Sequence, residues 1–178
     1  MTASRLPQRR ADLGRDAAAL LELHCLGNYE SDTPWARLTP YEQYRKEWLA
    51  TPQPAAFLAE LKASLQDGRS VVEVWEAEDQ VVGFLWLRFV DLPGYDMVMA
   101  SVSDIAVAPS YHRRGIGRRI LEYAEQAARQ QGAAVLRSEA GVENVASRGL
   151  HERRGFEVCR VILEKRLDPL PDVPPGRS

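Results

Sequence analysis

The chain has little cysteine, no long apolar run and no excess of charge of one sign. Its 178 residues include two cysteines, which argues against a disulfide scaffold or a cysteine-rich zinc site. The longest apolar stretches, such as Val81–Leu87, are far shorter than the roughly 20 residues of a transmembrane helix. A net charge of -2 disfavours a strongly basic nucleic-acid binder. The N-terminal MTASRLPQRR has no apolar core for a signal peptide, so we expect a soluble, cytoplasmic protein.

Length and composition predict one domain followed by a short tail. Domains of roughly 100–200 residues are typical, and a chain of this size can bury a substantial core. The segment 168–178, DPLPDVPPGRS, holds four prolines and little to bury. We therefore expect a single domain over residues 1–167 and a proline-rich tail that is ordered only when something docks it.

Apolar periodicity and turn residues predict helices early in the chain and mostly strands after them. The predicted helices are Arg15–Leu26, Pro40–Ala50, Ala55–Gln66, Gly115–Gln130 and Asn144–Arg153. The predicted strands are Ser70–Ala77, Val81–Val90, Met97–Val107, Ala133–Glu139 and Phe156–Arg166, with a hairpin turn between the first two. Their order predicts an α/β (α+β) fold, in which a mixed sheet carries helices on its faces.

Two glycines stand where a predicted strand passes into a helix, in the segment VAPSYHRRGIGRRIL that begins at Val107. Glycines let successive N–H groups converge, and a helix N-terminus adds unpaired donors and a partial positive charge. Four arginines surround the glycines: Arg113, Arg114, Arg118 and Arg119. The segment predicts a phosphate site, although the glycines could instead serve tight packing of helix on sheet. A Rossmann motif does not fit, because Ile120 stands in place of the third glycine. A P-loop does not fit either, because its motif GxxxxGK[ST] does not occur.

Two motifs at the right separation resemble the GCN5-related N-acetyltransferase (GNAT) family. The segment HRRGIG, His112–Gly117, is similar to the coenzyme A loop Q/R-x-x-G-x-G/A. The segment NVASRGLHERRGF, Asn144–Phe156, is similar to the signature N-x-x-A-x-x-L-Y-x-x-x-G-F. It departs from that signature at His151, which replaces the tyrosine, and His112 replaces the usual Gln or Arg. The resemblance covers roughly residues 71–166 and implies six to seven strands flanked by about four helices.

The resemblance also implies an acetyl-CoA site and no metal. The backbone of Ile105, Ala106 and Val107 would lie where two strands splay apart, and would hold pantetheine and the thioester carbonyl. Asn144 would contact the coenzyme A arm. The pyrophosphate would be bound by the loop residues His112, Arg113, Arg114, Gly115, Ile116, Gly117 and Arg118. For His112, simple closure of the loop is the alternative.

Three side chains are candidates for moving protons. Glu139 and His151 are twelve residues apart, as are the Glu and Tyr of ribosomal-protein N-terminal acetyltransferases, which this pair resembles. We predict Glu139 as the base and His151 as the acid for the thiolate; an ion pair with Arg137 and simple helix packing are the alternatives. Asp104 is a rival base beside the splay, or a surface ion pair. His24 is expected at the edge of the core.

The acceptor groove is expected between the first helices and the 91–96 loop. Aromatic and acidic side chains gather there, which suits a cationic amine, although the aromatic spacing on the second helix is also a packing pattern. These residues are Tyr29, Glu30, Asp32, Trp35, Tyr41, Tyr44, Trp48 and Tyr95.

The leading functional hypothesis is acetyl transfer from acetyl-CoA to a primary amine of a small molecule or peptide, by direct attack in a ternary complex. A non-catalytic acyl-CoA-binding or sensor protein on the same fold is the first alternative, suggested by the two histidine departures. An interaction or nucleic-acid module is the second, although the acidic composition disfavours nucleic acid and nothing in the sequence points to a membrane. The resemblance also allows a homodimer, through the sheet or the last strand.

Overall fold

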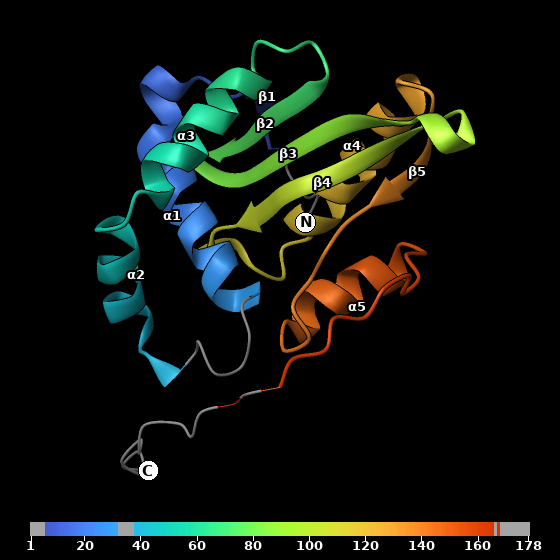
Figure 1. The fold of residues 1–178 in the computed structure, drawn as a ribbon. Helices are drawn as coiled ribbons and strands as arrows, with labels where there is room; N and C mark the ends of the chain where they lie inside the picture. The colour runs from blue at the N-terminus through green and yellow to red at the C-terminus, as the bar shows by residue number, and fades with distance from the viewer. Residues whose placement is uncertain (1–5, 32–37, 166, 168–178) are drawn as a thin grey trace.

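One sheet of five strands organises the computed structural model, which describes residues 6–31, 38–165 and 167 (Figure 1). Strands β1 to β4 are antiparallel to their neighbours, and β5 is parallel to β4. This arrangement confirms the mixed, mostly antiparallel sheet predicted from the sequence. In order across the sheet the strands are β1 (Gln8–Arg10), β2 (Ser70–Ala77), β3 (Gln80–Leu92), β4 (Met97–Val107) and β5 (Ala133–Arg137).

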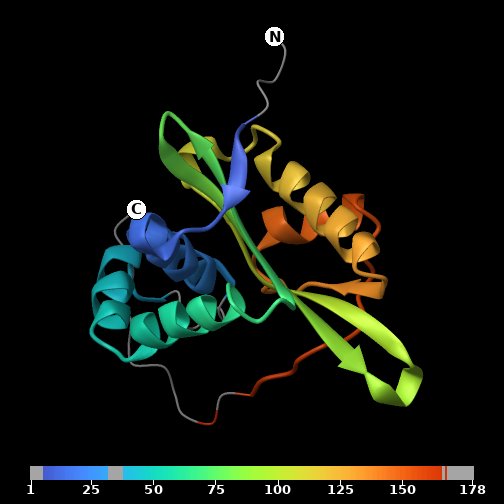
Figure 2. The same cartoon turned by 90° about the horizontal axis from the view of Figure 1, so that it is seen from above.

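Helices cover both faces of the sheet, as Figures 1 and 2 show from two directions. Helices α1 and α3 pack on one face, with α2 outside them, and α4 packs on the other face next to α5. The described residues thus form five α-helices, the number predicted from periodicity and one more than the family resemblance implies. Their bounds are α1 (Leu13–Ser31), α2 (Tyr41–Leu49), α3 (Gln53–Ser64), α4 (Ile116–Gln130) and α5 (Val145–Arg153).

The central strand β3 is apolar on both faces because both faces are covered. Phe84 and Trp86 point into the layer of α1 and α3, whereas Leu85 and Leu87 point into the layer of α4. A strand buried on both sides loses the alternation of apolar and polar residues. The continuous apolar run in the sequence is therefore the signature of this central position.

The hairpin expected between the first two strands is confirmed. Its two turn residues, Glu78 and Asp79, have φ angles of 51° and 61°. Positive φ at both central positions is typical of a type I′ turn, whose twist matches that of the flanking strands. The β3–β4 hairpin closes differently, through a short 3-10 helix at Pro93–Tyr95.

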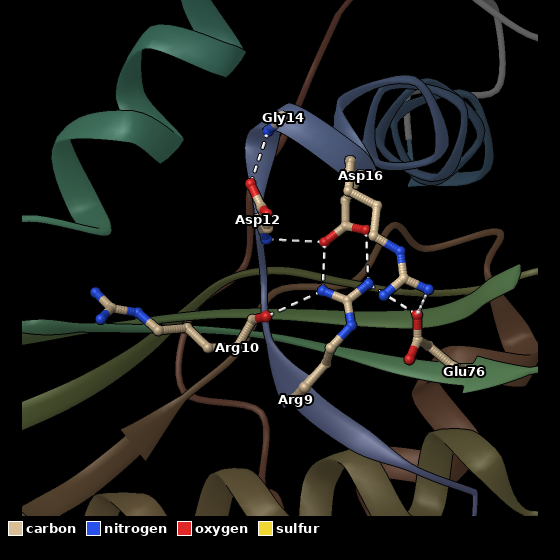
Figure 3. A network of polar contacts seen from close by, with 7 residues as sticks. Arg9, Arg10, Asp12, Gly14, Asp16 and Glu76 are labelled. Carbon is tan, nitrogen blue, oxygen red and sulfur yellow. Dashed lines mark hydrogen bonds and ion pairs between the residues drawn. The ribbon is translucent and has the colours of Figure 1, made fainter. Parts of the chain in front are cut away.

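A buried ion network joins the short strand β1, which the sequence analysis missed, to α1 and β2 (Figure 3). The Arg9 guanidinium donates to both carboxylate oxygens of Asp16 at 2.7 Å and to Glu76 at 2.8 Å. Asp16 is fully buried and also accepts the N–H of Asp12. Burial alone would raise the pKa of Asp16, but these hydrogen bonds outweigh it and lower the pKa below its usual value. The network therefore holds β1 and the start of α1 to β2, which lies more than 50 residues further along the chain.

The predicted last strand, Phe156–Arg166, is wrong for the described part of the chain. Residues 156–165 have no strand, and Arg166 lies outside the described residues. Their β-branched side chains raise β propensity, but a strand exists only through hydrogen bonds to a neighbour. The sheet therefore has five strands among the described residues rather than six or seven. The expected tail, 168–178, also lies outside the described residues.

Helix α1 is longer than the sequence predicts, because packing extends it. The predicted end was Leu26, where Gly27 and Asn28 weaken helix propensity. The helix continues to Ser31, and on this last stretch Gly27 passes close to Asp104 of β4. Tertiary contact thus overrides local propensity and carries α1 across the end of β4.

Candidate active site

The pairing between strands β4 and β5 ends halfway along β4. Their parallel pairing runs from Val98 with Ala133 to Ser101 with Arg137, whereas β4 continues, paired with β3, to Val107. The N–H of Ala108 donates to Val82 on β3, and hydrogen-bonding edges alternate along an antiparallel pair. The backbone groups of Val107 and Ile105 therefore point to the β5 side, into the splay predicted from the sequence.

Ala106 is the exception among the three residues predicted to offer backbone groups there. It stands opposite Phe84 in the β3–β4 register, one residue out of phase with Ile105 and Val107. Its N–H and C=O are directed toward β3 for that reason. Only Ile105 and Val107 offer backbone groups to the splay.

The two glycines of the loop have different physical roles. Gly115 caps the start of α4 with a φ of 79°, a left-handed conformation that favours glycine. The first helical hydrogen bond runs from the N–H of Arg119 to Gly115, so the N–H groups of residues 116–118 precede it and point out of the helix end. Gly117 instead allows close packing, because a Cβ there would lie 3.0 Å from Leu150 of α5. The packing interpretation of the motif is therefore confirmed at Gly117, and the exposed N–H groups behind Gly115 are compatible with a phosphate site, which stays a prediction.

Exposed arginines surround this helix end. Arg113 has a φ of 59°, which is uncommon for a residue other than glycine. The Arg114 guanidinium lies 4.8 Å from the centre of the Tyr111 ring, and Arg118 forms an ion pair with Glu122 at 3.6 Å. Cations next to helix N–H donors make an arrangement suited to a pyrophosphate.

His112 closes the loop rather than standing over it. Its Nε2 lies 2.7 Å from the carbonyl oxygen of Val107, and a carbonyl can only accept, so the imidazole donates. The bond ties the start of the phosphate loop to the end of β4. This is the second of the two arrangements considered for His112.

Asn144 caps α5, since its Oδ1 accepts the N–H of Ser147 at 3.0 Å. The other end of α5 is held by Arg154, which donates to Glu125 of α4 at 2.8 Å. Together with the contact between Gly117 and Leu150, these bonds set α5 against the start of α4.

His151 is buried, and both of its ring nitrogens have partners. Nδ1 lies 2.8 Å from the Ser147 carbonyl, and Nε2 lies 2.8 Å from the hydroxyl of Ser138 at the end of β5. Because the carbonyl only accepts, Nδ1 is the donor, and in the neutral ring Nε2 accepts the Ser138 proton. Phe156 packs edge-on against the ring. Ser138 is a polar neighbour that the sequence analysis missed.

Glu139, the next residue, is exposed and makes no ion pair with any described residue. The expected alternative, a pair with Arg137, is therefore absent from the described part of the chain. The chain brings His151 to Ser138 instead, one residue before the carboxylate that we expected it to accompany.

Asp104 contacts a histidine instead of an arginine or lysine at the surface. Its Oδ2 lies 2.5 Å from Nδ1 of His24, and the amide of Asn28 lies 3.1 Å from Nε2 of the same ring. The Asp104 side chain is 12% exposed and the His24 side chain 21%. Sequence reasoning placed His24 at the core edge and missed this pair, because nothing local shows that α1 crosses β4.

A cavity of about 540 Å³ opens beside this pair, between α1, α2 and the start of α3. It is lined by Asn28, Ser31, Tyr44, Glu47, Trp48, Thr51 and Gln53. The expected acceptor aromatics divide between this wall and ordinary packing: Tyr29 packs on Tyr41 and Tyr44 with ring centres 5.3 and 5.1 Å apart. Asp32 and Trp35 lie outside the described residues.

The 91–96 loop does not line this cavity, contrary to expectation. It closes the far end of the β3–β4 hairpin, where Leu92 pairs with Met97, and Tyr95 is exposed there. Asp104 contacts His24 of α1 near the other end of β4. Figure 2 shows α1, in blue, away from the tip of the β3–β4 hairpin. The length of the two strands separates the loop from the first helices.

The described part of the chain holds neither a cluster of side chains for a metal ion nor a helix that could span a membrane. Among residues 6–31, 38–165 and 167, no group of three or more His, Cys, Asp or Glu side chains is arranged to hold a metal ion. Within those ranges no helix combines the length and apolar character needed to cross a membrane.

Comparisons with known proteins agree with this geometry. A model of the acetyltransferase (GNAT) family matches residues 29–156. An uncharacterized N-acetyltransferase of Bacillus subtilis, YhfO, is 29% identical over 121 residues, which are 66% of this chain and 78% of that protein. The enzyme of Escherichia coli named for alanine N-acetylation of ribosomal protein bS18 is 39% identical over 62 residues, 35% of this chain and 42% of that enzyme.

Solved structures share the fold at lower identity. The aminoglycoside N-acetyltransferase AAC(6')-Iy, in complex with the bisubstrate analogue CoA-S-monomethyl-acetylneamine, has a TM-score of 0.64 and 20% identity. The match covers 92% of this chain and 99% of that chain. The family model alone spans more than half of the sequence, and its span contains the splay, the phosphate loop and α5. The chain therefore belongs to the acetyltransferase (GNAT) family.

Proposed function

We propose that this protein transfers the acetyl group of acetyl-CoA to a primary amine of a small molecule or peptide, by direct attack in a ternary complex. The observation that carries the proposal is the splay of β4 from β5 beside the N-terminus of α4. It sets backbone donors for a thioester and donors for a pyrophosphate next to each other. Its relatives are named N-acetyltransferases, which supports the same chemistry.

The described residues fit acetyl-CoA as a co-substrate. The N–H groups of residues 116–118, with Arg113, Arg114 and Arg118, would bind the pyrophosphate, and Gly115 supplies the turn that exposes them. Backbone groups of Ile105 and Val107 would bind the pantetheine arm and the thioester carbonyl. One such donor aimed at a developing oxyanion contributes about 3–4 kcal/mol to a transition state. Asn144 would contact the coenzyme A arm from the start of α5. This chemistry needs no metal.

The acceptor amine must lose a proton before it attacks. Glu139 and Asp104 are the two carboxylates considered for this task, and the geometry favours the position of Asp104, acting directly or through the His24 ring that it contacts. Asp104 is largely buried, adjoins Ile105 in the splay and is bonded to His24, whereas Glu139 is exposed at the end of β5.

The departing thiolate must gain a proton. We propose that His151 supplies it through the Ser138 hydroxyl, which lies 2.8 Å from Nε2 at the end of β5. In this arrangement the protonated imidazole gives its Nε2 proton to the serine oxygen, which passes its own proton to sulfur. His151→Ala should lower kcat by about 10²–10⁴-fold, the usual range for general acid catalysis. An unchanged kcat would exclude the role.

The test is calorimetric titration with acetyl-CoA, followed by thiol release against a panel of amines. We expect micromolar binding and release that depends on the amine. Binding without release from any amine would favour an acyl-CoA sensor on the same fold. An absence of binding, or DNA binding that is salt-sensitive and unaffected by coenzyme A, would overturn the proposal.

Two arginines of α4 offer a matched pair of variants. Arg118 pairs with Glu122 at the start of the helix, and Arg129 pairs with Glu125 at its end, both four residues apart and exposed. Arg118→Ala should weaken acetyl-CoA binding, and the weakening should shrink at high salt. Arg129→Ala removes the same charge from the same helix and should leave binding unchanged.

Location and assembly are part of the same proposal. The cysteines Cys25 and Cys159 are both free, which supports a reducing compartment such as the cytoplasm. The exposed apolar side chains of Val158, Val161, Ile162 and Leu163 support a homodimer, because a run of exposed apolar side chains is a docking surface. Sedimentation of the full chain tests the dimer, and a monomer at micromolar concentration would exclude it.

A further inference from the structure

We propose that His24, oriented by Asp104, is the group that takes the proton from the acceptor ammonium, and that the amine reaches it from the cavity between α1 and α2. The inference rests on the proposed acetyl transfer and adds to it a catalytic residue, an entry side and a substrate charge. The inference depends on the contact between α1 and β4 that brings His24 to Asp104.

The hydrogen bonds around His24 assign its protons. The amide nitrogen of Asn28, 3.1 Å from Nε2, can only donate, so Nε2 is the accepting nitrogen. The ring proton is therefore on Nδ1, where it is donated to the Asp104 carboxylate at 2.5 Å. This is the tautomer that a general base needs, since the lone pair on Nε2 is held away from the carboxylate. Asp104 in turn stabilises the imidazolium that forms.

The ring is also held in place by packing. The Phe57 ring of α3 stacks on His24 with centres 3.8 Å apart and planes 9° from parallel, and Trp48 of α2 packs at 5.8 Å. A fixed ring keeps Nε2 pointed at one place, which is a requirement for proton transfer in a defined geometry.

The cavity leads to Nε2. Asn28 and Trp48 touch His24 and also line the cavity, so a ligand there meets the ring by replacing the Asn28 amide. Asp104 directly precedes Ile105, whose backbone faces the splay. In this proposal a substrate that fills the cavity presents its amine to the His24 ring, which Asp104 joins to the strand of Ile105.

The charges on the surrounding elements suit a cation. Asp104 of β4 contacts the ring, and Glu47 of α2 lines the same cavity. On β3, Arg88 lies over the Trp86 ring at 5.0 Å and donates to Ser103 at 2.7 Å. α3 presents the uncharged Phe57. One carboxylate in the cavity wall and a second on the His24 ring favour an ammonium over an acidic acceptor.

The step balances without another reactant. The ammonium gives one proton to Nε2 and becomes a neutral amine. Its nitrogen lone pair forms a bond to the thioester carbon, and the carbon–sulfur bond breaks with its electron pair on sulfur. The nitrogen loses its second proton as the amide forms, and sulfur gains one to become the free thiol. His24 returns the first proton to solvent, so that the net products are amide, thiol and one proton.

The experiment compares pH profiles of kcat/KM for the wild-type chain, His24→Asn and Asp104→Asn. The asparagine of His24→Asn keeps an N–H for Asp104 but removes the titrating nitrogen. We expect kcat/KM at neutral pH to fall by about 10²–10⁴-fold, with the loss shrinking as pH rises and solvent deprotonates the amine. Acetyl-CoA affinity should not change.

Asp104→Asn distinguishes a base from a positioning residue. If His24 is the base, this variant keeps the acidic limb of the profile but lowers kcat/KM, because the ring loses the carboxylate that orients it. If Asp104 were itself the base, His24→Asn would keep the acidic limb and Asp104→Asn would abolish it, which overturns the inference.

Three controls separate the remaining outcomes. Glu22→Gln breaks an exposed pair between α1 and Arg45 of α2 and should leave kcat/KM unchanged. Thermal unfolding checks that each variant is folded, and His24→Gln gives a second test where His24→Asn does not fold. If the wild-type chain is active and His24→Asn has the same pH profile of kcat/KM, this inference alone is overturned. A wild-type chain that acetylates no amine overturns the proposed function, and the inference falls with it.

Discussion

Gly141 lies directly against the backbone of Ser31, the last residue of α1. A Cβ atom at this glycine would stand 2.7 Å from the carbonyl carbon and 2.8 Å from the Cα of Ser31. The loop between β5 and α5 is thereby held to the end of the helix that carries His24. Through this contact, the loop that leads to Asn144 meets the helix that borders the cavity.

Replacing Gly141 by alanine should push the loop between β5 and α5 away from the end of α1. The clash is with backbone, which cannot turn aside, so we expect a loss of about 1–3 kcal/mol of unfolding free energy. Acetyl-CoA should also bind more weakly, since the displaced loop leads to Asn144. Urea unfolding and calorimetry measure both effects. Gly94→Ala is the control, because nothing lies within 4 Å of a Cβ there, and equal midpoints for the two variants would contradict the prediction.

The left-handed backbone at Gly115 makes a second prediction. A Cβ at this position has open space around it, so the cost of Gly115→Ala is conformational, about 1–2 kcal/mol. Relief of that strain would turn the first N–H groups of α4 away, and acetyl-CoA should bind about tenfold more weakly for each 1.4 kcal/mol. Gly115→Asn should be milder, because asparagine adopts this conformation more readily than alanine. Equal affinities for the two variants would speak against a backbone phosphate site.

Gly117 should respond to substitution for a different reason. Its Cβ would meet the Leu150 side chain at 3.0 Å, so Gly117→Ala should push α5 away from α4. Shortening the partner with Leu150→Val makes room for the new methyl group. The double variant should therefore lose less unfolding free energy than the sum of the losses in the two single variants. A double-mutant cycle measures this difference. Simple additivity would mean that the two residues do not press on each other.

The Arg9–Asp16 pair predicts acid sensitivity. The pKa of the Asp16 carboxyl is lowered in the folded chain, so its contribution to stability is present above the unfolded pKa of about 4 and is lost as pH falls through the lower folded value. Asp16→Asn removes the buried charge partner of the partly buried Arg9 guanidinium, which keeps Glu76, and should cost about 1–3 kcal/mol at neutral pH. The unfolding free energy of this variant should also depend less on pH between pH 4 and the acid transition, which urea unfolding at several pH values measures. Arg69→Gln, which breaks an exposed pair with Asp91, is the control and should cost far less.

The two cysteines should differ in reactivity. Burial raises the pKa of the Cys25 thiol, so little thiolate is present at neutral pH, whereas Cys159 is exposed. A thiol reagent at pH 7 should modify one cysteine quickly and the second only on unfolding. Cys159→Ser should remove the fast phase. Fast labelling of Cys25 in that variant would reopen an acyl-cysteine route, which direct attack on the thioester does not require.

Most of the secondary structure was predictable because its signals are local. The strand Met97–Val107 was predicted with its observed bounds, and the I′ turn at Glu78 and Asp79 and the α4 periodicity mark their elements through nearby residues alone. The phosphate loop was predictable for the same reason, since its glycines and arginines are consecutive in the chain. The last predicted strand was wrong because residues 156–165 have strand-like side chains but pair with no strand among the described residues.

The sequence by itself determined the family, the element order and the residues of the phosphate loop, because each depends on spacing within a short segment. Only the tertiary structure decided which side chains meet. His24 and Asp104 are 80 residues apart, and Ser138 and His151 are 13 apart, with no local pattern to link them. Those meetings depend on how α1 crosses β4 and how α5 returns to β5, which packing energies over the whole sheet determine. The proton chemistry proposed for this chain therefore depends on the fold, even where its binding loop can be identified from sequence.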